Sequence, residues 1–156
     1  MKTMKLNKIL LAVFFVSSFV SANVNSKVYK ITNEQKKILN QAKSLRKSGL
    51  LNEAEDVYKN LFFKYPFLKE AMDPLKLILK EKKDWDALND IALKFTVANN
   101  NSFKSKSEII DIYLWTENIK WKNIVNDIYN DKSIPDKNIE IVLQALINSN
   151  KIDELN

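Results

Sequence analysis

The stretch Gln41–Pro66, QAKSLRKSGLLNEAEDVYKNLFFKYP, decides the fold of this chain. It predicts two short helices joined by a tight turn at Gly49, because glycine adopts the left-handed conformation that ends a helix without a Cβ penalty. Pro66 should end the second helix, since the residue before a proline is driven out of the helical region. The landmarks of this helix pair are Ala42, Gly49, Leu51, Ala54, Tyr58, Leu61 and Pro66.

Composition excludes several classes of function. The chain has 156 residues with no His and no Cys, which removes the usual zinc and haem ligands, thiol nucleophiles, disulfides and the Ser-His-Asp arrangement. We therefore expect no catalytic residues, no cofactor and no bound metal. A single glycine, three prolines and 46% hydrophobic residues favour an all-α fold.

Residues 1–22 predict a cleaved secretory signal peptide. Three lysines within the first eight residues precede the apolar run 9–16, and Val20-Ser21-Ala22 supplies a small-residue cleavage site. The alternative is an uncleaved anchor, but residues 9–20 provide far fewer than the roughly 20 apolar residues that a membrane-spanning helix needs. The sequence thus favours export to the bacterial periplasm or beyond, with no integral membrane span after cleavage.

The charge that remains after cleavage argues against a nucleic-acid partner. The chain carries 25 basic and 19 acidic residues, and losing the three lysines of the signal peptide lowers its net charge from +6 to about +3. We divide the remainder into a flexible lead-in over 23–31 and a helical domain over 32–156.

The helical pattern recurs after the first pair. Thr32 and Gln35 predict a capping box, and Ile38, Ala42 and Leu45 share one face of the helix that follows. Asn52 and Glu55 predict the cap of the next helix. Moving 34 residues on from Leu51, Ala54, Tyr58 and Leu61 leads to Trp85, Leu88, Ala92 and Phe95.

Later helix starts are also marked. Asp84 predicts an N-cap, and so does Asp73 with Pro74 in the first turn, although a helix kinked at Pro74 is the alternative. Ser105 with Glu108 predicts another capping box, followed by a face made of Ile109, Ile112, Tyr113 and Thr116. The last full helix should start at 133–136. The expected turn landmarks are Leu51, Trp85, Trp121 and Ile152.

The order and spacing of these residues resemble the tetratricopeptide repeat, a helix pair with a period of about 34 residues. The resemblance implies a right-handed α-solenoid of about three and a half antiparallel helix pairs. The repeats would cover residues 35–68, 69–102 and 103–134, with a partial repeat over 135–156. In this family the first helix of each pair lines a concave groove for peptides or partner helices.

The resemblance places five residues of the first repeat on that groove. Counted from Gln35, repeat positions 2, 5, 9, 12 and 13 are Lys36, Leu39, Lys43, Arg46 and Lys47. Such a surface would attract an acidic segment, although a solvated charged face is the simpler alternative. The second repeat is mixed in charge at the same positions, which hold Glu70, Asp73, Leu77, Lys80 and Glu81.

Two tryptophans and the last helix complete the candidates. Trp85 and Trp121 could stack against a ligand, but their position at the start of a helix favours packing in the core. The helix over 139–148 is apolar around most of its circumference. We expect Ile141, Ala145 and Ile147 to be partly exposed, and to be covered by another chain, by self-association or by residues outside this stretch of sequence. The alternative is that the last six residues fold back over them.

These patterns favour a non-enzymatic interaction module of the bacterial cell envelope that presents a helical groove to another protein or a peptide. The alternative is an accessory subunit of an envelope enzyme or of a polymer-processing or secretion machine, with the catalytic part on another chain. A stable stoichiometric partner with catalytic residues would distinguish the second from the first.

Overall fold

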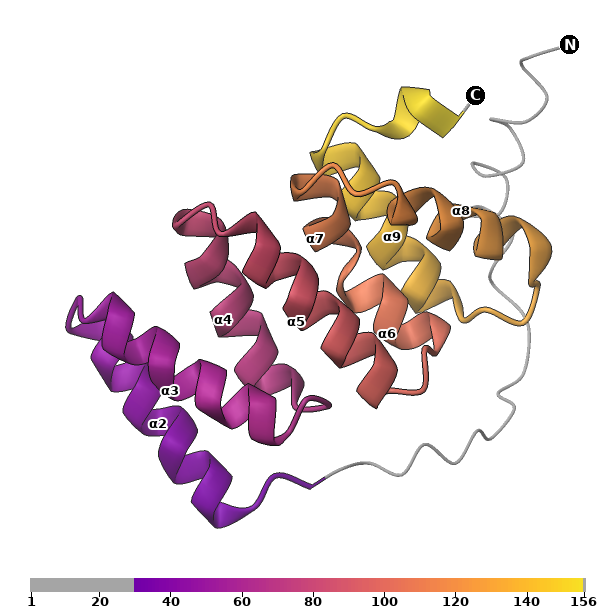
Figure 1. The fold of residues 1–156 in the computed structure, drawn as a ribbon. Coiled ribbons are helices and arrows are strands. Elements are labelled where there is room, and N and C mark those ends of the chain that lie inside the picture. The colour runs from indigo at the N-terminus through magenta and orange to yellow at the C-terminus, as the bar shows by residue number, and fades with distance from the viewer. Residues whose placement is uncertain (1–29, 156) are drawn as a thin grey trace, which may run out of the picture.

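The computed structural model describes residues 30–155, and within them the chain is all-helical, without strands (Figure 1). The predicted signal peptide, and the lead-in up to residue 29, lie outside the described residues. No helix between residues 30 and 155 combines the length and the apolar character needed to cross a membrane. The elements are α2 (Asn33–Lys47), α3 (Leu51–Lys64), α4 (Lys69–Glu81), α5 (Trp85–Ala98), α6 (Phe103–Glu108), α7 (Ile110–Trp115), α8 (Lys120–Asn130), α9 (Asp136–Asn148) and the 3-10 turn η1 (Ile152–Leu155).

The helices pack mainly on their neighbours in the sequence (Figure 1). From α2 to α5 each helix lies against the next, whereas α6 and α7 both contact α8 and α9. Buried apolar side chains of all these helices form one continuous core, which includes Tyr58, Phe62 and Met72. Burying a large apolar side chain contributes about 1.5–3 kcal/mol, so this core is the main source of stability.

The first helix pair forms around two alanines. Thr32 Oγ1 accepts a hydrogen bond from the Gln35 backbone N–H at 3.2 Å, and Gln35 Oε1 accepts one from the Thr32 N–H at 2.9 Å, which confirms the predicted capping box. Ala42 of α2 and Ala54 of α3 are both fully buried. Small side chains at these positions let the two helices pack closely.

The turns that end α2, α4, α5, α7 and α9 share one backbone geometry. Each contains a residue with positive φ, which is Asn100 after α5; after the other four helices it is Gly49, Lys83, Glu117 and Asn150, at spacings of 34, 34 and 33 residues. The N–H of the following residue bonds to the carbonyl five residues earlier, as from Leu50 to Leu45 at 3.0 Å. This is the Schellman motif, which satisfies the last carbonyls of a helix.

The predicted equivalence of Trp85 and Trp121 is wrong. Trp85 lies two residues after the left-handed Lys83, whereas Trp121 lies four residues after the left-handed Glu117. Two residues turn a helix by about 200°, so the two indoles point to opposite sides. Trp121 is 3% exposed in the core, but Trp85 is 40% exposed, which contradicts its predicted core packing.

Two predicted helix starts in the first half of the chain are also wrong. The N-cap of α4 is Leu68, so Asp73 caps nothing and Pro74 lies inside the helix. Pro74 leaves the carbonyl of Glu70 without its helical donor, but Glu70 is exposed, so water can replace that donor. The side chain of Asn52 does not cap α3 but instead accepts a hydrogen bond from Lys82 at 2.6 Å. Glu55 also pairs with Lys82.

The segment 103–115 differs most from the expected pattern. Instead of one helix started by Ser105, the chain forms α6 and α7 with a break at Ile109. Ser102 caps α6 by accepting from the Ser105 N–H at 3.2 Å. The helix α9 begins at Asp136, with no side-chain cap. Asp84 caps α5 as predicted, since its side chain accepts from the Ala87 N–H at 3.1 Å.

Candidate functional site

Two surface hollows lie on either side of α4. The first, which we call the basic hollow, has a volume of about 400 Å³ and lies between the end of α2 and the middle of α4. Its lining is Lys43, Arg46, Lys47, Tyr58 and Pro74. The second, the mixed hollow, has a volume of about 470 Å³. Its lining comes from α4, α6, α7 and α9 and from the residue that follows α9: Lys76, Lys80, Ser107, Glu108, Ile110, Asp111, Trp115, Ile141, Gln144, Ala145, Asn148 and Ser149.

The basic hollow carries three cations and no acidic group in its lining. Lys43, Arg46 and Lys47 belong to the last turns of α2, and none of them lies within ion-pair distance of a carboxylate among residues 30–155. Tyr58 is almost fully buried, and this burial raises the pKa of its phenol, while the positive charge of Arg46 partly opposes the rise. The hollow therefore has an uncompensated positive potential that suits an anionic group.

The structure brings together three of the five predicted groove residues. Lys36 is exposed but lies outside the lining of the basic hollow. The placement of Leu39 on an open groove is wrong, because its side chain is only 5% exposed and belongs to the core. Leu39 follows Gln35 by four residues and precedes Ala42 by three, so all three lie on the buried face of α2.

Trp115 and Lys80 dominate the mixed hollow. The Nζ atom of Lys80 lies 3.8 Å from the centroid of the Trp115 ring, and that of Lys76 lies 5.8 Å from it. A cation at such a distance over an indole contributes about 0.5–1 kcal/mol at an exposed site. Lys80 is exposed and has no carboxylate within ion-pair distance in the described part of the chain.

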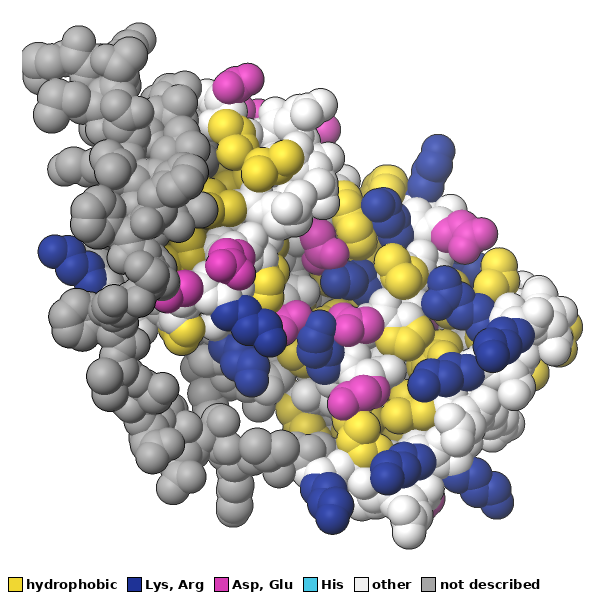
Figure 2. Space-filling model, turned by 180° about the vertical axis from the view of Figure 1, so that it is seen from behind, with side chains coloured by type: hydrophobic (Ala, Val, Ile, Leu, Met, Phe, Trp, Pro, Cys, Tyr) yellow, Lys and Arg dark blue, Asp and Glu magenta, His cyan; other side chains and the backbone are white. Residues whose placement is uncertain are grey.

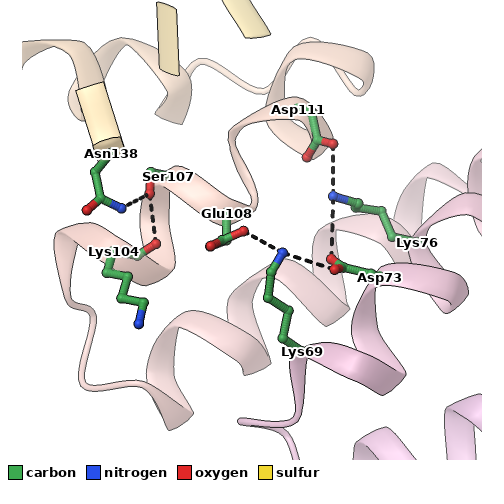
Figure 3. A network of polar contacts seen from close by, with 8 residues as sticks. All are labelled: Lys69, Asp73, Lys76, Lys104, Ser107, Glu108, Asp111 and Asn138. Atoms are coloured by element: carbon green, nitrogen blue, oxygen red, sulfur yellow. Dashed lines mark hydrogen bonds and ion pairs between the residues drawn. The ribbon is translucent and has the colours of Figure 1, made fainter. Parts of the chain in front are cut away.

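A polar network fixes the floor of the mixed hollow (Figure 3). Lys76 Nζ lies 2.9 Å from Asp111 Oδ2, and Lys69 Nζ lies 2.6 Å from Glu108 Oε2. Lys69 also donates to Asp73 within α4, at 2.9 Å. The two carboxylates that flank the break at Ile109 are thus paired with α4. Because these charges compensate one another, they leave Lys80 as the uncompensated charge of the lining.

A second contact anchors α9 to α6. Asn138 Nδ2 donates to Ser107 Oγ at 2.7 Å, and Ser107 donates to the carbonyl of Lys104 at 2.8 Å (Figure 3). Both side chains are buried, so the hydrogen bonds satisfy groups that would otherwise be costly to desolvate. This contact holds α9 as the outer wall of the mixed hollow.

The wall formed by α9 is partly apolar. Ile141 and Ala145 line the hollow and are half-buried, while Ile147 lies outside the lining and is 52% exposed. Gln144 donates a hydrogen bond to Asn148 at 2.9 Å along the same wall. Self-association through this helix stays a prediction.

Figure 2 shows how charged side chains are distributed over one face of the molecule. On the face drawn there, Lys and Arg side chains gather over the end formed by α2 to α4, among hydrophobic and fewer acidic side chains.

The sequence did not single out Trp115, and it placed Lys80 on the groove only by its repeat position. No sequence signal marks Trp115, because its exposure depends on the break at Ile109 and on the position of α9.

No group of three or more carboxylates in residues 30–155 is arranged to hold a metal ion. Comparison of the chain with protein-family models, with curated proteins and with solved structures finds no match. What can be said of the class of protein therefore comes from the structure itself. The chain is all-helical over the described residues and has a basic and a mixed hollow on either side of α4.

Proposed function

We propose that the protein is a non-enzymatic binding module of the bacterial cell envelope that holds an acidic segment of a partner protein. The observation that carries this proposal is the basic hollow, in which three cations of α2 meet without a compensating carboxylate. A charged surface of this kind steers an oppositely charged segment and sets its register, while nearby apolar contacts supply affinity. The signal peptide predicted over residues 1–22 supports the location.

We also infer that the helices form a right-handed α-solenoid of about three and a half pairs that resemble tetratricopeptide repeats. The left-handed residues at 49, 83, 117 and 150 support this, because their spacing is close to the 34-residue period of the family. A repeat array of this kind offers an extended binding surface, since each pair adds one more helix to the same face.

The experiment compares two triple variants of equal charge. We measure the fluorescence anisotropy of a labelled octaglutamate peptide at low ionic strength, where screening is weakest. Lys43→Glu/Arg46→Glu/Lys47→Glu should weaken binding at least tenfold. Lys104→Glu/Lys132→Glu/Lys137→Glu changes three exposed lysines elsewhere and should leave most of the binding in place. Equal losses in the two variants would show that only the total charge matters, and would overturn the proposal.

A further inference from the structure

We infer that the mixed hollow binds a second part of the partner segment. It takes an aliphatic side chain of that segment together with a nearby Glu or Asp carboxylate. This inference rests on the proposed function, because it describes what the same partner segment places on the other side of α4. In this inference the mixed hollow determines which partner segment binds, and the basic hollow attracts that segment over a longer distance.

The charge of the lining selects the carboxylate. Lys76 is paired with Asp111 and Glu108 with Lys69, so a ligand that displaced either pair would leave a partly buried charge uncompensated. Lys80 differs, because its exposed ammonium lies over the Trp115 ring and forms no ion pair with any carboxylate of residues 30–155. An incoming carboxylate can bind Lys80 without breaking an ion pair, so one negative charge is what the hollow favours.

The shape and polarity of the lining select the aliphatic group. Ile141 and Ala145 on α9 face a hollow that Trp115 closes from α7. A volume of about 470 Å³ falls in the range of sites that bind small ligands. A Leu-sized side chain would bury apolar area against these residues, at about 25 cal/mol per Å².

The source of the carboxylate follows from the path of the bound segment. On the circumference of α4, Leu77 lies between Pro74 of the basic hollow and Lys80 of the mixed hollow, and Leu77 is 44% exposed. A segment that occupies both hollows must cross this ridge, and in the proposed function this segment carries acidic side chains along its length. We therefore assign the carboxylate to an acidic side chain within the segment, and not to a chain terminus.

Nuclear magnetic resonance of the ¹⁵N-labelled protein tests the inference through its three indole N–H signals, assigned with single Trp→Phe variants. Trp121, which is buried, and Trp85, which does not line the hollow, are internal references. The probe is acetyl-Leu-Ala-Glu-amide, titrated to 20 mM. The matched peptides are acetyl-Leu-Ala-Gln-amide, acetyl-Ala-Ala-Glu-amide and acetyl-Ala-Leu with a free terminal carboxylate.

We expect the Glu peptide to shift the Trp115 signal with saturation in the millimolar range, while the other three bind at least fivefold more weakly. Lys80→Gln should remove the preference for Glu over Gln; because Lys80 is exposed, the fold should be kept. No selective shift of Trp115, or an unchanged preference in Lys80→Gln, would overturn the inference. Equal or tighter binding of the peptide with the free terminus would overturn the assignment to an acidic side chain.

The variant Lys43→Glu/Arg46→Glu/Lys47→Glu separates the two proposals. Its substitutions lie outside the mixed hollow, so its Trp115 response to the Glu peptide should stay within twofold of that of the parent. If octaglutamate binding does not depend on the α2 cations but the Trp115 response is present, the proposed function fails in its basic-hollow part alone. If octaglutamate binding depends on them but the Trp115 response is absent, the further inference fails alone.

Discussion

The ammonium of Lys76 on α4 lies 2.9 Å from the carboxylate of Asp111 at the start of α7, and so joins two residues 35 positions apart. The side chain of Lys76 is 11% exposed and that of Asp111 is 30% exposed. The pair therefore lies at the edge of the core, where it links the first half of the helical array to the second. Removing Lys76 would leave Asp111 without this partner, whereas removing Asp111 would leave Lys76 with only the more distant carboxylate of Asp73, at 3.9 Å.

We predict that Asp111→Ala lowers the free energy of unfolding by about 1.5–3 kcal/mol, the range for a lost hydrogen bond to a charged group. The double variant Lys76→Met/Asp111→Ala should lose less than the sum of the two single changes, because no charge is left unpaired. Urea denaturation of the four proteins measures this coupling. Additive losses would contradict an interaction between the two side chains.

The contact between α2 and α3 gives a second prediction. Ala54 is fully buried against the core, so Ala54→Trp should overpack it and lower the free energy of unfolding by about 1–3 kcal/mol. Glu53→Trp places the same side chain at the exposed neighbouring position and is the control. Thermal melts that show the same midpoint for both variants would rule out a close approach of the helices at Ala54.

The left-handed turns give predictions of opposite sign. Gly49 has φ +77°, and a Cβ atom at this position would meet no other atom within 4 Å. Gly49→Ala should therefore lower the free energy of unfolding by about 1 kcal/mol through backbone strain alone. Lys83 has φ +57°. Lys83→Gly should therefore raise the free energy of unfolding by up to about 1 kcal/mol, because it relieves the same strain. Glu81→Gly, at the end of α4, should instead be destabilising. Urea midpoints distinguish the three variants.

Lys69 predicts how stability changes at alkaline pH. Burial lowers the pKa of its ammonium, but hydrogen bonds to Glu108 and Asp73 and their negative charges raise it by more, so the folded pKa lies above the ordinary value. The ion pairs therefore contribute fully at neutral pH, below the pKa of the unfolded chain, and this contribution is lost as the pH rises through the folded pKa. Burial also raises the pKa of Tyr113, which adds a loss of the same sign above about pH 10.

We expect the melting temperature of the parent to fall steeply above about pH 10. Lys69→Met should have a lower melting temperature at pH 8 but a smaller further drop between pH 8 and 11, because it lacks one of the groups that titrate. Calorimetry at a series of pH values measures both slopes. Parallel curves for the two proteins would show that the ionisation of Lys69 does not contribute to the loss of stability at alkaline pH.

Export remains a prediction that protein chemistry can test. Three lysines, a short apolar run and Val20-Ser21-Ala22 predict cleavage after Ala22. N-terminal sequencing of the protein from its native host should therefore begin near Asn23. An intact Met1 on protein recovered from a soluble cytosolic fraction would contradict this.

The sequence by itself determined the helical class and much of the first pair. The Thr32–Gln35 capping box and the left-handed turn at Gly49 could be predicted because they depend on residues a few positions apart. The same holds for Asp84 as an N-cap. Local hydrogen bonding and backbone sterics decide such features before the chain is packed.

Local signals failed where several conformations satisfy the same pattern. Asp73-Pro74 matches a helix start as well as a helix interior, and packing of Met72 and Leu75 in the core favours the interior. Trp121 was wrongly aligned with Trp85, because the alignment relied on the spacing in the sequence. Only the backbone shows that the left-handed residue of that turn is Glu117, four residues before Trp121.

Only the tertiary structure decided the candidate site. The resemblance placed the three cations of α2 on a groove, but the hollow exists because Tyr58 of α3 and Pro74 of α4 close it. The mixed hollow depends on contacts between residues far apart in the sequence, such as Lys80 with Trp115 and Ser107 with Asn138. Sequence periodicity fixes which side of a helix is apolar, whereas the position of one helix against another depends on how all the buried side chains pack together.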